Sequence, residues 1–233
     1  MNAISPRPHL PGRFITLEGA EGVGKSTQLR LLAERIRGLG IEVLETREPG
    51  GEPEAERIRN FLLEGKAMTW GSGAEALLFA TARLHHMQGR ILPALRRGAY
   101  VISDRFFDST RVYQGIAGQV GDAELDVLDR LATNGRSPDL TLIFDLPVEE
   151  AMSRTSARRG NAAPDRFEGE AREFHDRLRE GFLRIAAAHP ERCQLVDAAG
   201  ADRDALSQRL FDVVVDRFSE LAELQTDTED PQP

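Results

Sequence analysis

Cysteine is almost absent from this chain, since Cys193 is the only one among 233 residues. A single cysteine excludes a disulfide within the chain and a metal cluster built on cysteine ligands. Such a composition is typical of proteins that work in the reducing cytoplasm. We therefore expect a cytoplasmic protein without structural disulfides.

Long apolar runs are missing as well. No run approaches the roughly 20 residues that span a bilayer, and residues 1–11 are rich in proline and lack the apolar segment of a signal peptide. The formal net charge of −8 argues against a broad nucleic-acid surface, although clustered arginines can still bind a phosphorylated small molecule. We expect neither a membrane nor a nucleic acid among the partners.

Lysine is rare too, because only Lys25 and Lys66 occur beside 28 arginines. Lys25 belongs to residues 19–26, which fit the pattern G-x-x-x-x-G-K-S/T of a loop that wraps the phosphates of a nucleotide. Residues 14–17 read as a buried strand and residues 27–36 as an amphipathic helix. The pattern predicts an ATP-binding loop of Gly19, Ala20, Glu21, Gly22, Val23, Gly24, Lys25, Ser26 and Thr27.

The residue types of this loop have physical reasons. Gly22 and Gly24 permit backbone shapes that a side chain would block, and the start of the following helix adds partial positive charge. The Lys25 ammonium would reach the outer phosphates, and the Ser26 hydroxyl would bind Mg²⁺. ATP as co-substrate and Mg²⁺ as cofactor follow from this interpretation.

Four further apolar runs read as strands separated by helical patterns: residues 41–45, 100–103, 140–144 and 194–196. This alternation predicts an α/β fold, a five-stranded, mostly parallel sheet with helices on both faces. The length and the 40% apolar content suit a single domain. We expect its core at residues 12–222 and flexible tails at residues 1–11 and 225–233.

Three of the predicted strands run into an aspartate. Asp104, Asp145 and Asp197 would lie at the carboxyl edge, where open α/β sheets bind their ligands. Asp104 is the strongest candidate for a carboxylate on the Mg²⁺ side of the site. For Asp145 and Asp197 we favour a structural role in which each caps or precedes a helix, because aspartate is a preferred N-cap residue.

Residues 74–97 carry a helical core stripe, with Pro93 as the expected kink: Leu77, Ala80, Leu84, Met87, Ile91 and Leu95. Phe79 and Arg83 fall outside this stripe, one turn apart and on a shared face. Together they can stack on a base and hydrogen-bond to it. The alternative, in which Phe79 packs on a neighbouring helix and Arg83 is solvated, stays open.

Four strings occur in order along the chain: the glycine loop with Glu21, residues 46–51, residues 78–83 and residues 104–115. In sequence and spacing they resemble the bacterial thymidylate kinases, over roughly residues 12–222. The resemblance implies the P-loop nucleoside monophosphate kinase fold with a lid. It also implies transfer of the ATP γ-phosphoryl group to dTMP, giving dTDP for dTTP synthesis, a Mg²⁺ requirement and a homodimer.

The resemblance further implies a nucleoside pocket. Phe79 resembles the ring that stacks on thymine, Arg83 the donor to a thymine carbonyl, and Tyr113 the side chain that crowds the ribose 2′ position. The polar groups that line the pocket would be Ser109, Thr110 and Gln114. Arg111 and Val112 precede Tyr113, where many members have an alanine directly before the tyrosine, so the fine shape of the pocket stays open.

A phosphate network completes the implied substrate site. Glu21 matches an acid near the sugar 3′-hydroxyl and the monophosphate, and Glu48 an acid close to Mg²⁺. Arg105 and Arg59 match arginines that hold the acceptor phosphate. For Arg59 a plain surface ion pair with the nearby Glu56 is an open alternative.

Residues 154–167 resemble the lid of the family and read as a mobile loop. Its arginines are Arg154, Arg158, Arg159 and Arg166. The acceptor phosphate is mostly dianionic at neutral pH and needs no general base, so catalysis must be positioning and charge neutralisation. We expect the catalytic set to be Lys25, Arg105, Arg158 and Arg159, with a solvated basic helix end as the alternative for the lid arginines.

Three other functions compete with this interpretation. The nearest is a kinase for another nucleoside or deoxynucleoside monophosphate. A nucleotide switch that hydrolyses GTP should carry N-K-x-D, which this chain lacks, and an ATP-gated binding module would turn over no second nucleotide. A P-loop kinase of a non-nucleotide metabolite would leave Phe79, Arg83 and Tyr113 without a base or sugar to contact.

Overall fold

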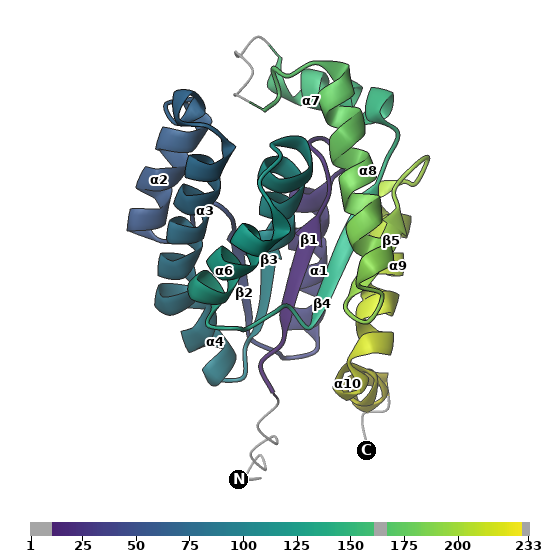
Figure 1. Cartoon of the computed structure of the whole chain (residues 1–233). Coiled ribbons are helices and arrows are strands. Elements are labelled where there is room, and N and C mark those ends of the chain that lie inside the picture. The colour runs from purple at the N-terminus through teal and green to yellow at the C-terminus, as the bar shows by residue number, and fades with distance from the viewer. Residues whose placement is uncertain (1–10, 161–166, 230–233) are drawn as a thin grey trace.

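A five-stranded parallel sheet forms the centre of the computed structural model, which describes residues 11–160 and 167–229 (Figure 1). The strand order is β2-β3-β1-β4-β5, and the four pairings within the described residues are all parallel. The predicted five-stranded α/β sheet is therefore confirmed. The strands are β1 (Phe14–Glu18), β2 (Val43–Arg47), β3 (Tyr100–Asp104), β4 (Leu140–Asp145) and β5 (Cys193–Asp197).

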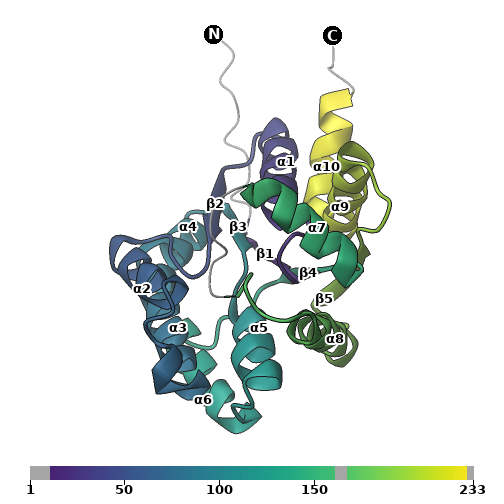
Figure 2. The same cartoon turned by 90° about the horizontal axis from the view of Figure 1, so that it is seen from above.

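Helices cover both faces of the sheet. Figure 2 shows α1, α9 and α10 on one face and α3, α5, α6 and α8 on the other. Helix α7 crosses the carboxyl edge in the same view. The helices are α1 (Lys25–Gly38), α2 (Pro53–Leu63), α3 (Ser72–His86), α4 (Leu92–Arg96), α5 (Phe107–Thr110), α6 (Asp122–Thr133), α7 (Val148–Arg159), α8 (Arg172–Ala188), α9 (Arg203–Arg217) and α10 (Ser219–Glu229). Shorter segments are the 3₁₀ turn η1 (Met68–Trp70) and the π-helical η2 (Met87–Ile91) and η3 (Arg111–Ala117).

Both faces of the central strands are buried, as a parallel sheet between two helical layers requires. Ile15 and Leu17 of β1 pack in the cluster that contains α1 and α9. The alternate residue Phe14 packs with Val101 and Ile91 on the opposite face. This alternation follows from the two-residue period of a strand. Because the helices cover the two faces of the sheet, its carboxyl edge remains available for a site.

The helical pattern at residues 74–97 is only partly as predicted. Its first helix, α3, ends at His86, and the chain passes through η2 before Pro93 enters the first turn of α4, where proline is tolerated. Leu77 is 56% exposed, whereas Arg83 is 2% exposed. The predicted core stripe is therefore wrong at Leu77, because α3 is buried mainly against α2 and α6 rather than against the sheet.

Asp145 and Asp197 precede α7 and α9 but cap neither helix. Asp145 accepts from Arg179, and Asp197 accepts from the nitrogen of Ala199 two residues later. Asp202 is the aspartate that caps a helix, α9.

The predicted C-terminal tail is also partly helical, since α10 continues to Glu229. Residues 1–10 and 230–233 of the expected tails lie outside the described part of the chain. Across the described residues, none of the helices combines the length and apolar character needed to cross a bilayer.

Candidate active site

The glycine loop connects the end of β1 to the start of α1. Gly19, Gly22 and Gly24 have φ angles of 135°, 80° and 100°, a region that favours glycine. A Cβ atom on Gly22 would lie 2.1 Å from the carbonyl oxygen of Ala151 in α7, so only glycine fits this approach. Because α1 begins at Lys25, the loop ends at a helix N-terminus whose amides and dipole favour an anion.

Lys25 is folded back onto this loop. Its side chain is 6% exposed, and Nζ donates to the carbonyl oxygens of Gly19 at 3.0 Å and Ala20 at 2.7 Å. Burial, followed by repulsion from the Arg105 guanidinium, lowers the pKa of Lys25 to about 8. The structure thus holds a desolvated ammonium beside the place that phosphates would occupy.

Ser26 and Asp104 meet across the start of α1 and the end of β3. The Ser26 hydroxyl donates to Asp104 Oδ2. Within the described residues no cluster of three or more histidine, cysteine or acidic side chains could hold a metal ion. One hydroxyl and one carboxylate suit Mg²⁺, which keeps several waters and takes other ligands from phosphates.

Arg105 stands at the centre of the site, directly after β3, in a left-handed conformation with φ of 72°. Its guanidinium donates to the Gly19 carbonyl oxygen at 3.0 Å, Ser109 Oγ at 2.9 Å and Glu21 Oε1 at 2.7 Å. The Tyr113 hydroxyl donates to the same Glu21 oxygen at 2.6 Å. Arg105 therefore ties the glycine loop to the α5–η3 segment.

The charges in this cluster stabilise one another. Burial raises the pKa of Glu21, but Arg105 and Lys25 outweigh it, so that the pKa ends below its usual value. Burial lowers the pKa of Arg105, yet Tyr113 and Glu21 raise it overall. Burial raises the pKa of the Tyr113 phenol well above 10. The result is an ionised Arg105–Glu21 pair beside a neutral phenol.

A second group of predicted residues lies between α3 and η3. Arg83 donates from Nε to Glu48 Oε2 at 2.7 Å and from Nη2 to Thr110 Oγ1 at 2.9 Å. Its Nη1 lies 3.6 Å from Asp129 Oδ1 but has no hydrogen bond to any described residue. Arg83 is thus buried and fixed, and the alternative of a solvated Arg83 is wrong.

Arg59 is partly buried and faces the same space. Its Nη1 donates to the Pro49 carbonyl oxygen at 2.8 Å. Among the described residues Glu56 pairs with Arg47 at 3.1 Å, and Arg59 forms no ion pair with it. Burial and the neighbouring Arg47 charge lower the pKa of Arg59, which marks a cation without a full counterion.

These groups line one cleft of about 450 Å³, a volume typical of small-ligand sites. The described basic side chains that line it are Lys25, Arg47, Arg59, Arg83, Arg105, Arg154 and Arg158. The acidic ones are Glu21, Glu48, Asp104 and Glu168. The other predicted site residues on its wall are Gly22, Gly24, Ser26, Thr27, Phe79, Ser109, Thr110, Tyr113 and Gln114. The cleft thus carries an excess of positive charge.

Some predicted residues lie off this wall. Val23 is 1% exposed and packs in the core, and Gly19 contributes its carbonyl oxygen behind the loop. Ala20 and Arg159 line a second, smaller cavity of about 120 Å³. Arg159 lines this smaller cavity, whereas Arg158 lines the main cleft, and both contact Glu168, which borders the two cavities.

The described arginines of the expected lid belong to a helix rather than to a loop. Arg154, Arg158 and Arg159 all lie within α7, so the prediction of a mobile loop is wrong for residues 154–159. Arg158 contacts Glu168 at 3.0 Å and is 63% exposed at its side chain. Arg166 falls in residues 161–166, outside the described part of the chain.

Glu18 is a residue of the site that the sequence analysis missed. It ends β1, is fully buried, and accepts from the backbone nitrogen of Phe106 at 2.7 Å and from Ser109 Oγ at 2.6 Å. Burial, followed by repulsion from Asp108, raises its pKa to about 8. Glu18 therefore fixes the backbone that follows Arg105. The only signal in the sequence was an acidic residue ending an apolar run.

Comparisons with known proteins agree with this geometry. The thymidylate kinase family model matches residues 17–208. The chain is 51% identical to a thymidylate kinase of Bradyrhizobium sp. (strain ORS 278), over 89% of this chain and 91% of that protein. It is 50% identical to that of Afipia carboxidovorans, over 89% and 91%.

A solved structure shares both fold and sequence with this chain. The crystal structure of thymidylate kinase from Ehrlichia chaffeensis matches with a TM-score of 0.68 and 33% identity, covering 88% of this chain and all of that one. The chain belongs to the thymidylate kinase family.

Proposed function

We propose that this chain transfers the γ-phosphoryl group of ATP to dTMP, giving dTDP and ADP. One observation carries the proposal: a phosphate-binding loop with a buried lysine and a pocket shaped by Phe79 and Arg83 open into the same cleft. A donor triphosphate and an acceptor nucleotide can therefore be held face to face. Positioning of this kind supplies much of the catalysis in phosphoryl transfer.

The nucleoside end of the pocket suits a pyrimidine with a carbonyl group. The Phe79 ring lines the cleft and offers a stacking surface. Arg83 is a buried cation that lines the cleft, and its guanidinium carries N–H donors suited to a base carbonyl. Tyr113 and Gln114 lie nearby on η3, where the sugar of such a base would sit.

The phosphate end suits charge neutralisation. Lys25 would move from the loop carbonyls to the outer phosphates of ATP, and Arg105 would hold the acceptor phosphate in line. Ser26 and Asp104 would hold Mg²⁺, which neutralises phosphate charge when bound. Arg158, which lines the cleft from α7, would contact the transferring group. Phosphate dianions repel each other, so these cations make the close approach possible.

We also propose a homodimer formed through α3 and α6, which pack side by side (Figures 1 and 2). These helices expose large apolar side chains: Leu77 at 56%, Val127 at 47% and Leu131 at 68%. Apolar side chains that gather on adjacent helices are typical of interfaces.

The reaction is tested by measuring ADP release with ATP and Mg²⁺ against a panel of dTMP, dUMP, dCMP, dGMP and AMP. We expect the highest kcat/KM with dTMP, and its loss in Lys25→Met. A higher kcat/KM with another monophosphate would make the chain a kinase for that nucleotide. ATP turnover that needs no acceptor would instead indicate a nucleotide-driven switch.

A further inference from the structure

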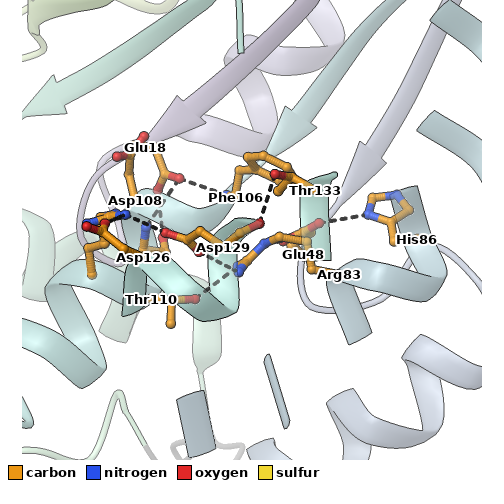
Figure 3. Close-up of polar contacts among 12 residues, drawn as sticks. Glu18, Glu48, Arg83, His86, Phe106, Asp108, Thr110, Asp126, Asp129 and Thr133 are labelled. Atoms are coloured by element: carbon orange, nitrogen blue, oxygen red, sulfur yellow. Dashed lines mark hydrogen bonds and ion pairs between the residues drawn. The ribbon is translucent and has the colours of Figure 1, made fainter. Parts of the chain in front are cut away.

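His86 is a fully buried histidine at the end of α3 that stands outside the cleft wall. Its Nδ1 lies 3.1 Å from Glu48 Oε1, and its Nε2 lies 2.6 Å from Thr46 Oγ1. Figure 3 shows Glu48 between His86 on one side and Arg83 on the other. The histidine therefore touches a residue that touches the base-binding arginine, without reaching the cleft itself.

The contact with Glu48 requires a hydrogen on Nδ1 of His86. An ionised carboxylate only accepts, so Nδ1 carries the hydrogen that is donated to Glu48. The Thr46 hydroxyl both donates and accepts, so it can pair with Nε2 whether or not that nitrogen carries a hydrogen. A ring with its hydrogen on Nδ1 satisfies both neighbours, and every polar atom of the His86 ring is used.

His86 and Arg83 divide the two oxygens of one carboxylate between them. Oε1 of Glu48 faces His86, and Oε2 accepts from Arg83 Nε at 2.7 Å. His86 and Arg83 stand three residues apart on α3, so one helix face presents both donors. Glu48 is 5% exposed, and water has little access to replace a missing donor.

Loss of the His86 donor would change how Glu48 binds Arg83. The freed Oε1 would be a buried acceptor without a partner, which is unfavourable. It can gain one by accepting from Arg83 Nη2, on the same edge of the guanidinium as Nε, because carboxylates favour such two-point contacts. The guanidinium would turn toward Glu48 to align this second contact, which changes its geometry with Thr110 and its aim at the base.

The backbone above His86 adds a second constraint. A Cβ atom on Gly51 would lie 2.5 Å from His86 Nε2, so the chain after Glu48 lies directly on the ring. The same segment supplies the Pro49 carbonyl oxygen that accepts from Arg59. His86 thus supports the segment that carries Glu48 as well as the carboxylate itself.

We propose that His86 is a positioning residue for base recognition: by donating from Nδ1 to Glu48, it fixes the carboxylate that aims the Arg83 guanidinium at the base. This inference rests on the proposed function, because it assumes that Arg83 donates to a carbonyl of the acceptor base. His86 itself touches no substrate, so its effect must pass through Arg83 and appear in acceptor binding rather than in ATP binding.

The test compares two amides that replace different nitrogens of the ring. The asparagine amide nitrogen can take the place of Nδ1, whereas the glutamine amide nitrogen takes the place of Nε2. We expect His86→Gln to raise the KM for dTMP about tenfold, as loss of one aligned hydrogen bond would do. We expect His86→Asn to stay within about twofold of the wild type, with KM for ATP unchanged in both.

A second readout reports the base contact directly. 5-Methyl-dCMP carries an amino group where dTMP carries the 4-carbonyl, so a correctly aimed Arg83 discriminates between them. We expect His86→Gln to lower the dTMP preference about tenfold and His86→Asn to keep it. The matched control is His85→Gln, because His85 is the exposed neighbour on the same helix and should behave as wild type.

The outcomes separate the possible failures. Equal damage in the asparagine and glutamine variants, or a KM for ATP that rises together with that for dTMP, would show a merely structural role and overturn the inference. Unchanged selectivity in His86→Gln would overturn it as well. A wild-type protein that does not phosphorylate dTMP would overturn the proposed function and this inference together.

Discussion

At the scale of single residues, the environment of Lys25 favours the binding of an anion. Its ammonium is almost fully buried, and it is held by two carbonyl oxygens rather than by a carboxylate. Carbonyl dipoles compensate a charge only in part, and the nearby Arg105 guanidinium opposes it. Phosphates bound at the loop would therefore stabilise the charged form of Lys25.

We predict that ATP binding takes up a proton at alkaline pH. Lys25 of the free protein has a pKa of about 8, below its ordinary value of 10.5, so it loses its proton as the pH rises through 8. Bound phosphates favour the charged form, and affinity should fall, by up to about tenfold per pH unit, above that point. Titration calorimetry in two buffers of different ionisation enthalpy measures the uptake.

The control for this prediction is Lys25→Arg, because a guanidinium keeps its charge throughout this range. Proton uptake should vanish in that variant, even where binding is weaker. The same uptake in both proteins would assign the proton to another group.

The residues that could be predicted from sequence are those whose spacing is dictated by phosphate chemistry. The glycine loop, Lys25 and Ser26 follow from a local pattern, and Asp104 follows from its place at a strand end. Glu18 and His86 could not be found in this way. The partner of Glu18, Phe106, lies 88 positions further along the chain, and a single sequence contains no signal for such a pair.

At the scale of the element, helix α7 contacts the glycine loop and also supplies arginines to the main cleft. Its Ala151 carbonyl oxygen lies against the Gly22 backbone, and Arg154 and Arg158, about one and two turns later, face the main cleft. Arg159 turns toward the smaller cavity because successive residues of a helix point about 100° apart. The geometry therefore distinguishes two adjacent arginines that looked equivalent in the sequence.

We predict that Arg158→Ala lowers kcat by on the order of 10³, with little change in KM for ATP, because a cation on the transferring group acts mainly in the transition state. Arg159→Ala should have a clearly smaller effect. Steady-state kinetics with dTMP measures both, and Arg184→Ala, an exposed residue paired with Glu180, serves as the control. Equal turnover in all four proteins would remove α7 from the mechanism.

Helices and strands could be predicted from the sequence where the burial of apolar side chains alone determines the pattern. Apolar runs located all five strands to within two residues. The strands β1, β3 and β4 are buried almost throughout and so have few polar positions, and the edge strands β2 and β5 each keep a short apolar stretch. The face of α3 was not predictable, since Leu77 and Arg83 depend on where α2 and α6 lie. Polar arginine-rich residues 154–159 were mistaken for a loop, although α7 begins at Val148 with a buried residue.

At the scale of the whole molecule, the exposed apolar side chains on α3 and α6 support the proposed homodimer. We predict that Leu131→Glu yields a monomer, because a charge placed in an apolar interface loses its water. Sedimentation velocity or light scattering after gel filtration measures the mass. Leu195→Glu, at an exposed position on edge strand β5, should remain a dimer. A dimer in both variants would place the interface elsewhere.

The cation-rich cleft has a consequence for how substrates arrive. The whole chain carries a net charge of −8, whereas the described side chains lining the cleft include seven basic and four acidic groups. An anion approaching most of the surface is repelled, and one approaching the cleft is attracted over roughly a Debye length, about 8 Å in physiological salt. The protein thus guides nucleotides to one opening, and dissolved salt weakens that guidance. Bulky polyanions that cannot enter the opening meet only the repulsive exterior.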